Sequence, residues 1–256
     1  MLRQMEEDPA FRFACSQAVQ LDWMRREQPE LFGRIRARAA EGRFVPCGGA
    51  WVEPDCNLPS GESLVRQFLY GQRFYEREFG RRCAEFWNPD VFGYSAQLPQ
   101  ILRRAGIRRF LTQKLSWSQF NRFPHHTFLW EALDGSRVLT HFPPSDTYNA
   151  RPDVRTLLSS RDRFLDADRA QESYLLFGHG DGGGGPSRDH LALIARLGDC
   201  AGVPRVAFRS PAEFFDRCER DLQDPAVWIG ELYLELHRGT YTTQAAVKRD
   251  NRRCEE

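Results

Sequence analysis

The sequence predicts an α/β protein in which helices pack outside a largely parallel sheet. Two observations support this fold class. Short apolar runs of strand length alternate with amphipathic segments along most of the 256 residues. A chain of this length can also bury a substantial core, and one large domain is expected.

The predicted strands are short runs rich in apolar and β-branched residues, bounded by turn-forming or charged residues. They cover residues 11–16, 44–48, 83–87, 109–113, 128–133, 137–142, 174–178 and 205–208. Asp134 and Gly135, between two of these runs, form a strong hairpin signal.

The predicted helices show apolar residues three or four positions apart. They cover residues 29–42, 62–79, 95–102 and 186–197, with a last clear helix opening at residue 210. Gly80 ends the second helix, and Ser95 is the expected N-cap of the third. Ser210, Pro211 and Glu213 follow the pattern of a capping box with proline in the first helical position.

Composition excludes several classes of protein. Lys and Arg number 36 against 35 Asp and Glu, and this near balance, with the two signs interspersed, favours neither a nucleic-acid nor a polyanionic partner. Seven cysteines occur singly, which indicates a reducing compartment and no cysteine zinc site. The N-terminus is too polar for a signal peptide, and no apolar run reaches membrane-spanning length. We therefore expect a cytoplasmic protein without a membrane segment.

Asp90 is the first residue whose context suggests chemistry. It follows a buried strand and precedes a helix, the position where α/β enzymes keep reacting groups. Phe92 and Tyr94 would supply an apolar wall of the kind that sugars pack against. Asp90 is thus a candidate nucleophile or metal ligand.

Asp181 lies in a glycine-rich loop, residues 178–185, between a predicted strand and a helix. Glycines allow the backbone to approach a ligand closely. The loop lacks the Lys-Ser/Thr of a phosphate-binding loop, so the remaining interpretations are a plain glycine loop or a sugar site with Asp181 as the acid.

Two further positions stay ambiguous from the residues alone. Asp146 is either a turn aspartate that bonds its own backbone or part of a site, and His237 is either structural or a metal ligand. His125 and His126 are expected in a solvated loop. Two carboxylates suit glycosidic cleavage, yet two carboxylates and a histidine also suit another kind of metal-dependent hydrolase.

Residues 87–95 (Trp-Asn-Pro-Asp-Val-Phe-Gly-Tyr-Ser) resemble the nucleophile segment of the class II α-mannosidases, glycoside hydrolase family 38. The resemblance is to the cytosolic-type branch and extends from about Phe11 to Cys254. Five further segments match in the same order, and they are residues 48–62, 66–72, 111–117, 180–186 and 235–243.

The resemblance implies an irregular (β/α) barrel of mostly parallel strands with outer helices, and a retaining exo-α-mannosidase that holds one divalent metal, Zn²⁺ or Co²⁺. Asp90 would be both nucleophile and metal ligand, and His237 a second ligand. Asp181 would be the general acid and base. The substrates would be terminal α-mannosides of free oligosaccharides or N-glycans.

The same resemblance assigns the sugar-binding residues. Phe92 would stack under the sugar, and Asp146 with Tyr148 would line the same pocket. Lys114 lies where some relatives carry arginine.

One departure concerns the first strand of the family, which carries a His-x-Asp pair of metal ligands followed by a tryptophan. No such strand precedes residue 11 here, so we expect a barrel that lacks its first strand and binds metal weakly. We also expect the chain to be a fragment of a longer enzyme.

Residues 1–247 would be the partial catalytic domain, and residues 248–256 the start of a helical one. A homo-oligomer is one option for the full-length parent. Two alternatives are a non-catalytic carbohydrate-binding remnant and another metal-dependent hydrolase.

Overall fold

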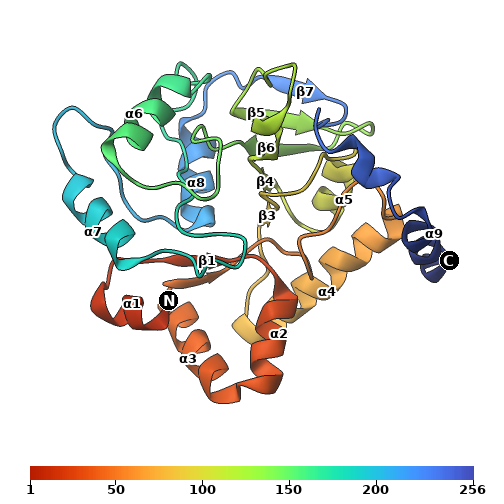
Figure 1. The fold of residues 1–256 in the computed structure, drawn as a ribbon, viewed down its shortest axis with the longest axis horizontal. Coiled ribbons are helices and arrows are strands. Elements are labelled where there is room, and N and C mark those ends of the chain that lie inside the picture. The colour runs from red at the N-terminus through yellow and green to blue at the C-terminus, as the bar shows by residue number, and fades with distance from the viewer.

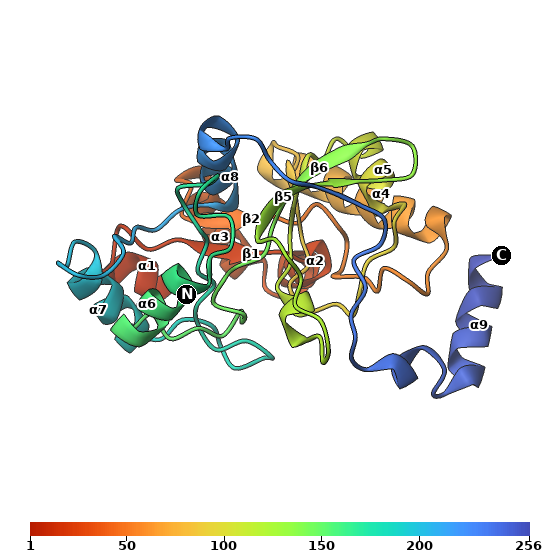
Figure 2. The ribbon, with the colours of Figure 1, turned by 90° about the horizontal axis from the view of Figure 1, so that it is seen from above.

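The computed structural model describes residues 1–256 and contains two sheets covered by helices (Figures 1 and 2). The first sheet pairs two parallel strands, β1 (Phe13–Cys15) and β2 (Phe44–Pro46). The second sheet has the order β3-β4-β6-β5-β7. Its strands are β3 (Glu85–Trp87), β4 (Arg109–Leu111), β5 (Thr127–Glu131), β6 (Arg137–His141) and β7 (Val227–Ile229).

The five-stranded sheet is mixed rather than wholly parallel. β5 runs antiparallel to β6, whereas every other neighbouring pair in this sheet is parallel. The antiparallel pair is the predicted hairpin, with Asp134 accepting a 3.0 Å bond from the Ser136 amide and Gly135 at a φ of 82°. The α/β class is therefore confirmed, but the two separate sheets do not confirm a closed barrel.

Helices make up the rest of the regular structure (Figure 1). They are α1 (Leu2–Glu7), α2 (Ala18–Glu27), α3 (Pro29–Ala40), α4 (Gly61–Phe79), α5 (Leu98–Arg104), α6 (Val154–Arg163), α7 (Arg188–Leu197), α8 (Pro211–Asp221) and α9 (Ala245–Glu255). Two 3₁₀ helices span Lys114–Trp117 and Arg238–Tyr241. None of the helices has the length and apolar character needed to cross a membrane.

Local capping rules set several helix ends. Gly80 adopts the left-handed conformation that ends α4, and its amide bonds the Glu76 carbonyl. Ser210 and Glu213 form the predicted capping box of α8, with Pro211 inside it. Ser95 is not an N-cap, because α5 begins only at Leu98 and the Ser95 hydroxyl bonds the Gln97 side chain instead.

Two predicted strands do not form. Residues 174–178 and 205–208 belong to no strand, and of these only Phe177 makes an isolated bridge, to Ala150. Three helices that the pattern did not indicate, α1, α2 and α6, are present. The predicted boundary near residue 247 falls inside α9, and nothing in the structure tests whether a second domain begins there.

The core consists of three apolar clusters that hold the carboxyl ends of the strands in place. The largest lies beneath the five-stranded sheet and includes Phe86, Phe110, Phe128 and Trp130. The rings of Phe86 and Phe110, which are paired across β3 and β4, stack at 5.4 Å. These strands therefore present their following loops from a rigid base.

Candidate active site

Asp90 lies in the turn that follows β3, where the sequence predicted it. Asn88, just past the strand, is completely buried and donates from its side chain to the Pro54 carbonyl at 3.1 Å. The Tyr94 hydroxyl donates to the Asn88 carbonyl at 2.7 Å. Gly93 completes the turn at a φ of 106°, which a side chain would strain. These bonds fix the direction in which the Asp90 carboxylate leaves the strand.

Lys114 supplies the positive charge that faces Asp90. It begins the 3₁₀ helix after β4, and its Nζ lies 2.6 Å from Asp90 Oδ1. The residue is only 2% exposed, and its ammonium sits 3.4 Å from the Trp117 ring centroid and 4.9 Å from that of Phe92. A buried ammonium needs such partners, so Lys114 is held against the carboxylate rather than reaching into solvent.

Tyr148 connects the two carboxylates that the sequence singled out. Its hydroxyl oxygen lies 2.9 Å from Asp90 Oδ2 and 3.0 Å from Asp181 Oδ1. Because the two bonds share one atom, these carboxylate oxygens lie at most 5.9 Å apart, the sum of the two lengths. Burial and the two neighbouring carboxylates raise the pKa of the Tyr148 hydroxyl above its ordinary value, so it stays protonated. Asp90, Tyr148 and Asp181 thus form one cluster.

The glycine loop brings Asp181 to this cluster. Two backbone bonds between His179 and Gly185, at 2.9 and 2.7 Å, close the loop at its base. A Cβ at Gly180 would lie 2.5 Å from the Asn149 side chain and 2.7 Å from the Tyr148 ring. Only glycine fits there, which explains why a glycine directly precedes Asp181.

His237 lies against the same aromatic residues as Lys114. Its ring centroid is 4.8 Å from that of Phe92 and 6.3 Å from that of Trp117. It is exposed and has a φ of 55°, an uncommon backbone conformation for a histidine. His237 and Lys114 therefore lie near the same Phe92 ring, and no hydrogen bond joins His237 to Asp90.

The residues present do not complete a metal site. No group of three or more His, Cys, Asp or Glu side chains is arranged to hold an ion. Both Asp90 oxygens are already bonded, one to Lys114 and one to Tyr148. His179 and Asp181 also form a His-x-Asp pair in the sequence, and they belong to no such group either.

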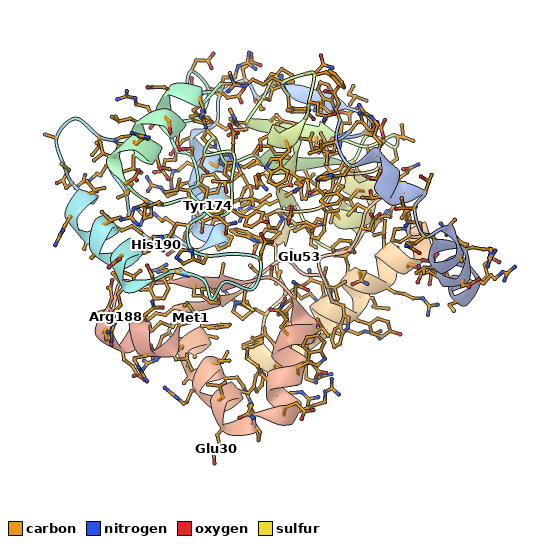
Figure 3. The ribbon with its side chains drawn as sticks, viewed as in Figure 1. Met1, Glu30, Glu53, Tyr174, Arg188 and His190 are labelled. Atoms are coloured by element: carbon orange, nitrogen blue, oxygen red, sulfur yellow. The ribbon has the colours of Figure 1, made fainter.

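Glu53 is a neighbour of the site that the sequence reasoning did not single out. Figure 3 shows it in the interior, unlike Glu30 and Arg188 at the periphery. Its carboxyl accepts a bond from the Ser16 hydroxyl. Burial raises its pKa, and the charge of Asp90 adds to that rise. The only signal in the sequence was its place in the matching segment 48–62.

Asp146 does not share a cavity with Tyr148. It lines a smaller cavity of about 390 Å³, and Arg163 lies 3.4 Å from its carboxylate. Burial raises its pKa. Tyr148 instead lines a cavity of about 1220 Å³ together with the glycine loop. The two residues thus line different cavities in the structure, and their roles at the sugar stay predictions.

The two adjacent histidines are also not in a solvated loop. The Asp166 carboxylate accepts from the backbone amides of His126 and Thr127 at 2.5 and 2.9 Å and lies 3.1 Å from His125 Nδ1. His126 is consequently buried, and burial lowers its pKa to about 4.

Comparison with known proteins places this site in a family. The fold resembles the crystal structure of an alpha-mannosidase from Enterococcus faecalis V583, with a TM-score of 0.72 over 90% of this chain and 27% of that one, at 20% identity. The chain is 56% identical over 254 residues to Alpha-mannosidase 2C1 from Homo sapiens and 55% identical over 251 residues to Alpha-mannosidase G from Dictyostelium discoideum. Those alignments cover 99% and 98% of this chain but only 24% and 23% of the relatives.

The sequence profile described as "Glycosyl hydrolases family 38 N-terminal domain" matches residues 1–231. The chain belongs to this family. It spans about a quarter of the length of the relatives it matches, so the activity of those whole proteins does not transfer to it directly.

Proposed function

We propose that this chain carries the glycoside-cleaving site of an α-mannosidase catalytic domain, which removes terminal α-mannosides from oligosaccharides with retention of configuration. The observation that carries the proposal is the placement of one hydroxyl between Asp90 and Asp181. The resulting limit of 5.9 Å on their oxygens is compatible with the separation of about 5–5.5 Å in retaining glycosidases and shorter than the roughly 6.5–9.5 Å of inverting ones.

The charges beside the two carboxyls also suggest their roles. Asp90 faces the Lys114 ammonium, which stabilises it as a carboxylate. Asp181 accepts from the Tyr148 hydroxyl and has no cationic side chain beside it. This arrangement favours Asp90 as nucleophile and Asp181 as acid.

The mechanism then has two steps. Asp90 attacks the anomeric carbon while Asp181 gives its proton to the leaving oxygen, and a glycosyl-enzyme forms. Asp181, now a carboxylate, takes a proton from water, which hydrolyses the intermediate. Lys114 holds Asp90 Oδ1, so that Oδ2 is the oxygen directed at the sugar, and Phe92 provides the apolar face for the ring.

A divalent metal, Zn²⁺ or Co²⁺, remains part of the proposal only as a prediction. Asp90 and His237 are its two candidate ligands in this chain, and no catalytic step above depends on it.

The proposed barrel is supported by the positions of Asp90, Lys114 and Tyr148, which follow the carboxyl ends of β3, β4 and β6. The cytosolic-type relatives favour the cytoplasm as its location.

The test is hydrolysis of 4-nitrophenyl α-mannoside, with the anomer of the product followed by NMR, in metal-free buffer and with added Zn²⁺ or Co²⁺. We expect α-mannose as the first product. Asp90→Asn should abolish the rate, whereas Asp199→Asn, which alters a solvent-exposed carboxylate, should not. β-Mannose as the first product would contradict the proposal.

A non-catalytic carbohydrate-binding remnant is the second candidate, favoured by the incomplete set of metal ligands. Binding of methyl α-mannoside without turnover under any of these conditions would establish it. Cleavage of esters or amides without cleavage of glycosides would instead indicate another kind of hydrolase.

A further inference from the structure

Few contacts fix Asp181 itself, although the glycine loop carries it to the catalytic cluster. Its carboxylate has one hydrogen-bond partner, the Tyr148 hydroxyl, which also bonds Asp90. Its backbone has a φ of 49°, a left-handed conformation that is uncommon outside glycine and that needs support from the surrounding structure. The four residues after it, 182–185, are all glycine, which restricts the backbone least. The support for Asp181 therefore has to come from the residues before it.

The chain before Asp181 runs beside the segment that follows β6. The Ala150 amide donates to the Leu176 carbonyl at 3.1 Å, and the Gly178 amide donates to the Ala150 carbonyl at 3.4 Å. These two bonds form a short parallel bridge between Ala150 and Phe177. They end at Gly178, so they place the base of the loop without fixing the direction in which Asp181 points.

Asn149 makes the next contact between these two segments. Its Oδ1 accepts from the Gly180 amide, so a side chain takes the place that a backbone carbonyl would have in a continued bridge. Its own amide donates to the Thr147 hydroxyl at 3.0 Å, which holds the asparagine in a local turn. The Gly180 carbonyl accepts from the Gly183 amide at 2.8 Å. The residue directly before the acid is therefore bonded at both its amide and its carbonyl.

Asn149 and Tyr148 are neighbours in sequence, and each of them bonds the loop. Tyr148 bonds the Asp181 carboxylate, whereas Asn149 bonds the backbone one residue earlier. Asn149 is exposed and makes no hydrogen bond to either catalytic carboxyl. Any effect that it has on the chemistry is consequently transmitted through Gly180.

We propose that Asn149 is a positioning residue, which orients Asp181 through the Gly180 amide so that the acid can donate its proton to the leaving oxygen. This inference rests on the proposed function, in which Asp181 is the acid. It adds a residue outside the catalytic pair on which that role depends.

The test uses the dependence of acid catalysis on the leaving group. 2,4-Dinitrophenolate leaves without a proton, whereas 4-methoxyphenolate needs one, so only the second α-mannoside depends on a well-placed acid. Both substrates are compared by kcat/KM, which covers the steps from free enzyme to the first transition state. Asn149→Leu keeps the approximate size of the side chain and removes the acceptor. We expect kcat/KM to fall about three- to tenfold for the 4-methoxyphenyl substrate and by less than about twofold for the 2,4-dinitrophenyl substrate.

Two further variants control for loss of structure. Asn149→Asp keeps an oxygen that can accept from the Gly180 amide, so it should recover most of the lost rate. Asn251→Leu, the same substitution at an exposed asparagine of α9, is the matched control and should behave as the parent. The thermal unfolding midpoint should stay close to that of the parent in all three variants, because both asparagines are exposed.

A second measurement does not depend on activity. In protein labelled with ¹³C at the aspartate carboxyls, the Asp181 signal is assigned by its loss in Asp181→Asn. We expect Asn149→Leu to shift this NMR signal and Asn251→Leu to leave it in place.

The outcomes separate this inference from the proposed function. Equal losses with both substrates in Asn149→Leu, or no loss with either, overturn the positioning role and leave the proposed function standing. Failure of the parent chain to hydrolyse either α-mannoside contradicts the proposed function, and a shifted Asp181 signal in Asn149→Leu then still supports the positioning role. An unshifted Asp181 signal in Asn149→Leu overturns the positioning role whether or not the parent is active.

Discussion

Removal of the Tyr148 hydroxyl is the most direct perturbation of the proposed catalytic pair. Tyr148→Phe keeps the ring that packs against Gly180 and deletes the oxygen bonded to Asp90 and Asp181. We expect kcat/KM for 4-nitrophenyl α-mannoside to fall while the fold is retained, because Tyr148 is only partly buried and the substitution keeps the ring that packs against a core cluster.

The size of the effect follows from the bond that is lost. A hydrogen bond to a charged group contributes about 1.5–3 kcal/mol, and each 1.4 kcal/mol corresponds to a factor of about ten. Tyr148 is partly exposed, so water replaces some of the lost bonding and the lower half of this range applies. The expected loss in kcat/KM is therefore about 10- to 40-fold, with most of it in kcat because the hydroxyl orients reacting groups.

The assay measures kcat and KM separately and compares them with the thermal unfolding midpoint of each variant. Tyr70→Phe is the matched control, since Tyr70 is an exposed tyrosine of α4 whose hydroxyl makes no hydrogen bond in the structure. An unchanged kcat/KM in Tyr148→Phe would refute the idea that this hydroxyl sets the spacing and proton position of the two carboxyls.

Three further predictions concern buried charge. Lys114→Met should lower kcat/KM about 10- to 100-fold by removing the ammonium from Asp90, with partial recovery in Lys114→Arg, as steady-state kinetics would show. Burial lowers the pKa of His126 to about 4, so this residue takes up a proton more readily in the unfolded chain, and the free energy of unfolding should decline as the pH falls from about 6.5 to about 4. In urea titrations, the decline should be smaller in His126→Gln than in the parent, by up to about 3 kcal/mol. Glu85 should have the opposite effect on the pH dependence of stability. Burial raises its pKa to about 7, so stability is lost as the pH rises from about 4.5 to about 7. Glu85→Gln should therefore raise the free energy of unfolding by about 1–3 kcal/mol at pH 8 and leave it unchanged at pH 4.

The parts of the site that follow local rules could be predicted from the sequence. The place of Asp90 was predicted correctly because an apolar strand is followed at once by a turn. The end of α4 and the start of α8 were predicted because caps are local. The roles assigned to Asp90, Asp181 and His237 came from the family resemblance, and the structure does not test them.

The features that depend on long-range contacts could not be predicted. Nothing near Lys114 in the sequence indicates that its ammonium is buried between Trp117, Phe92 and Asp90. The burial of His126 results from Asp166, forty residues away in the sequence, which bonds its backbone amide.

The two strands that fail to form show where composition is insufficient. Residues 174–178 and 205–208 have strand-forming composition, yet they pair with no neighbouring strand. β-propensity measures how well side chains fit a pleated surface with partners on either side, so it predicts a segment's conformation better than its pairing. Both segments instead line the larger cavity. There Tyr174 packs edge-on against Trp87 with centroids 5.9 Å apart and donates to the Arg209 carbonyl at 2.7 Å. Contacts with β3 and with the segment before α8 therefore hold Tyr174 in place without a ladder, and the sheet keeps the five strands that do pair.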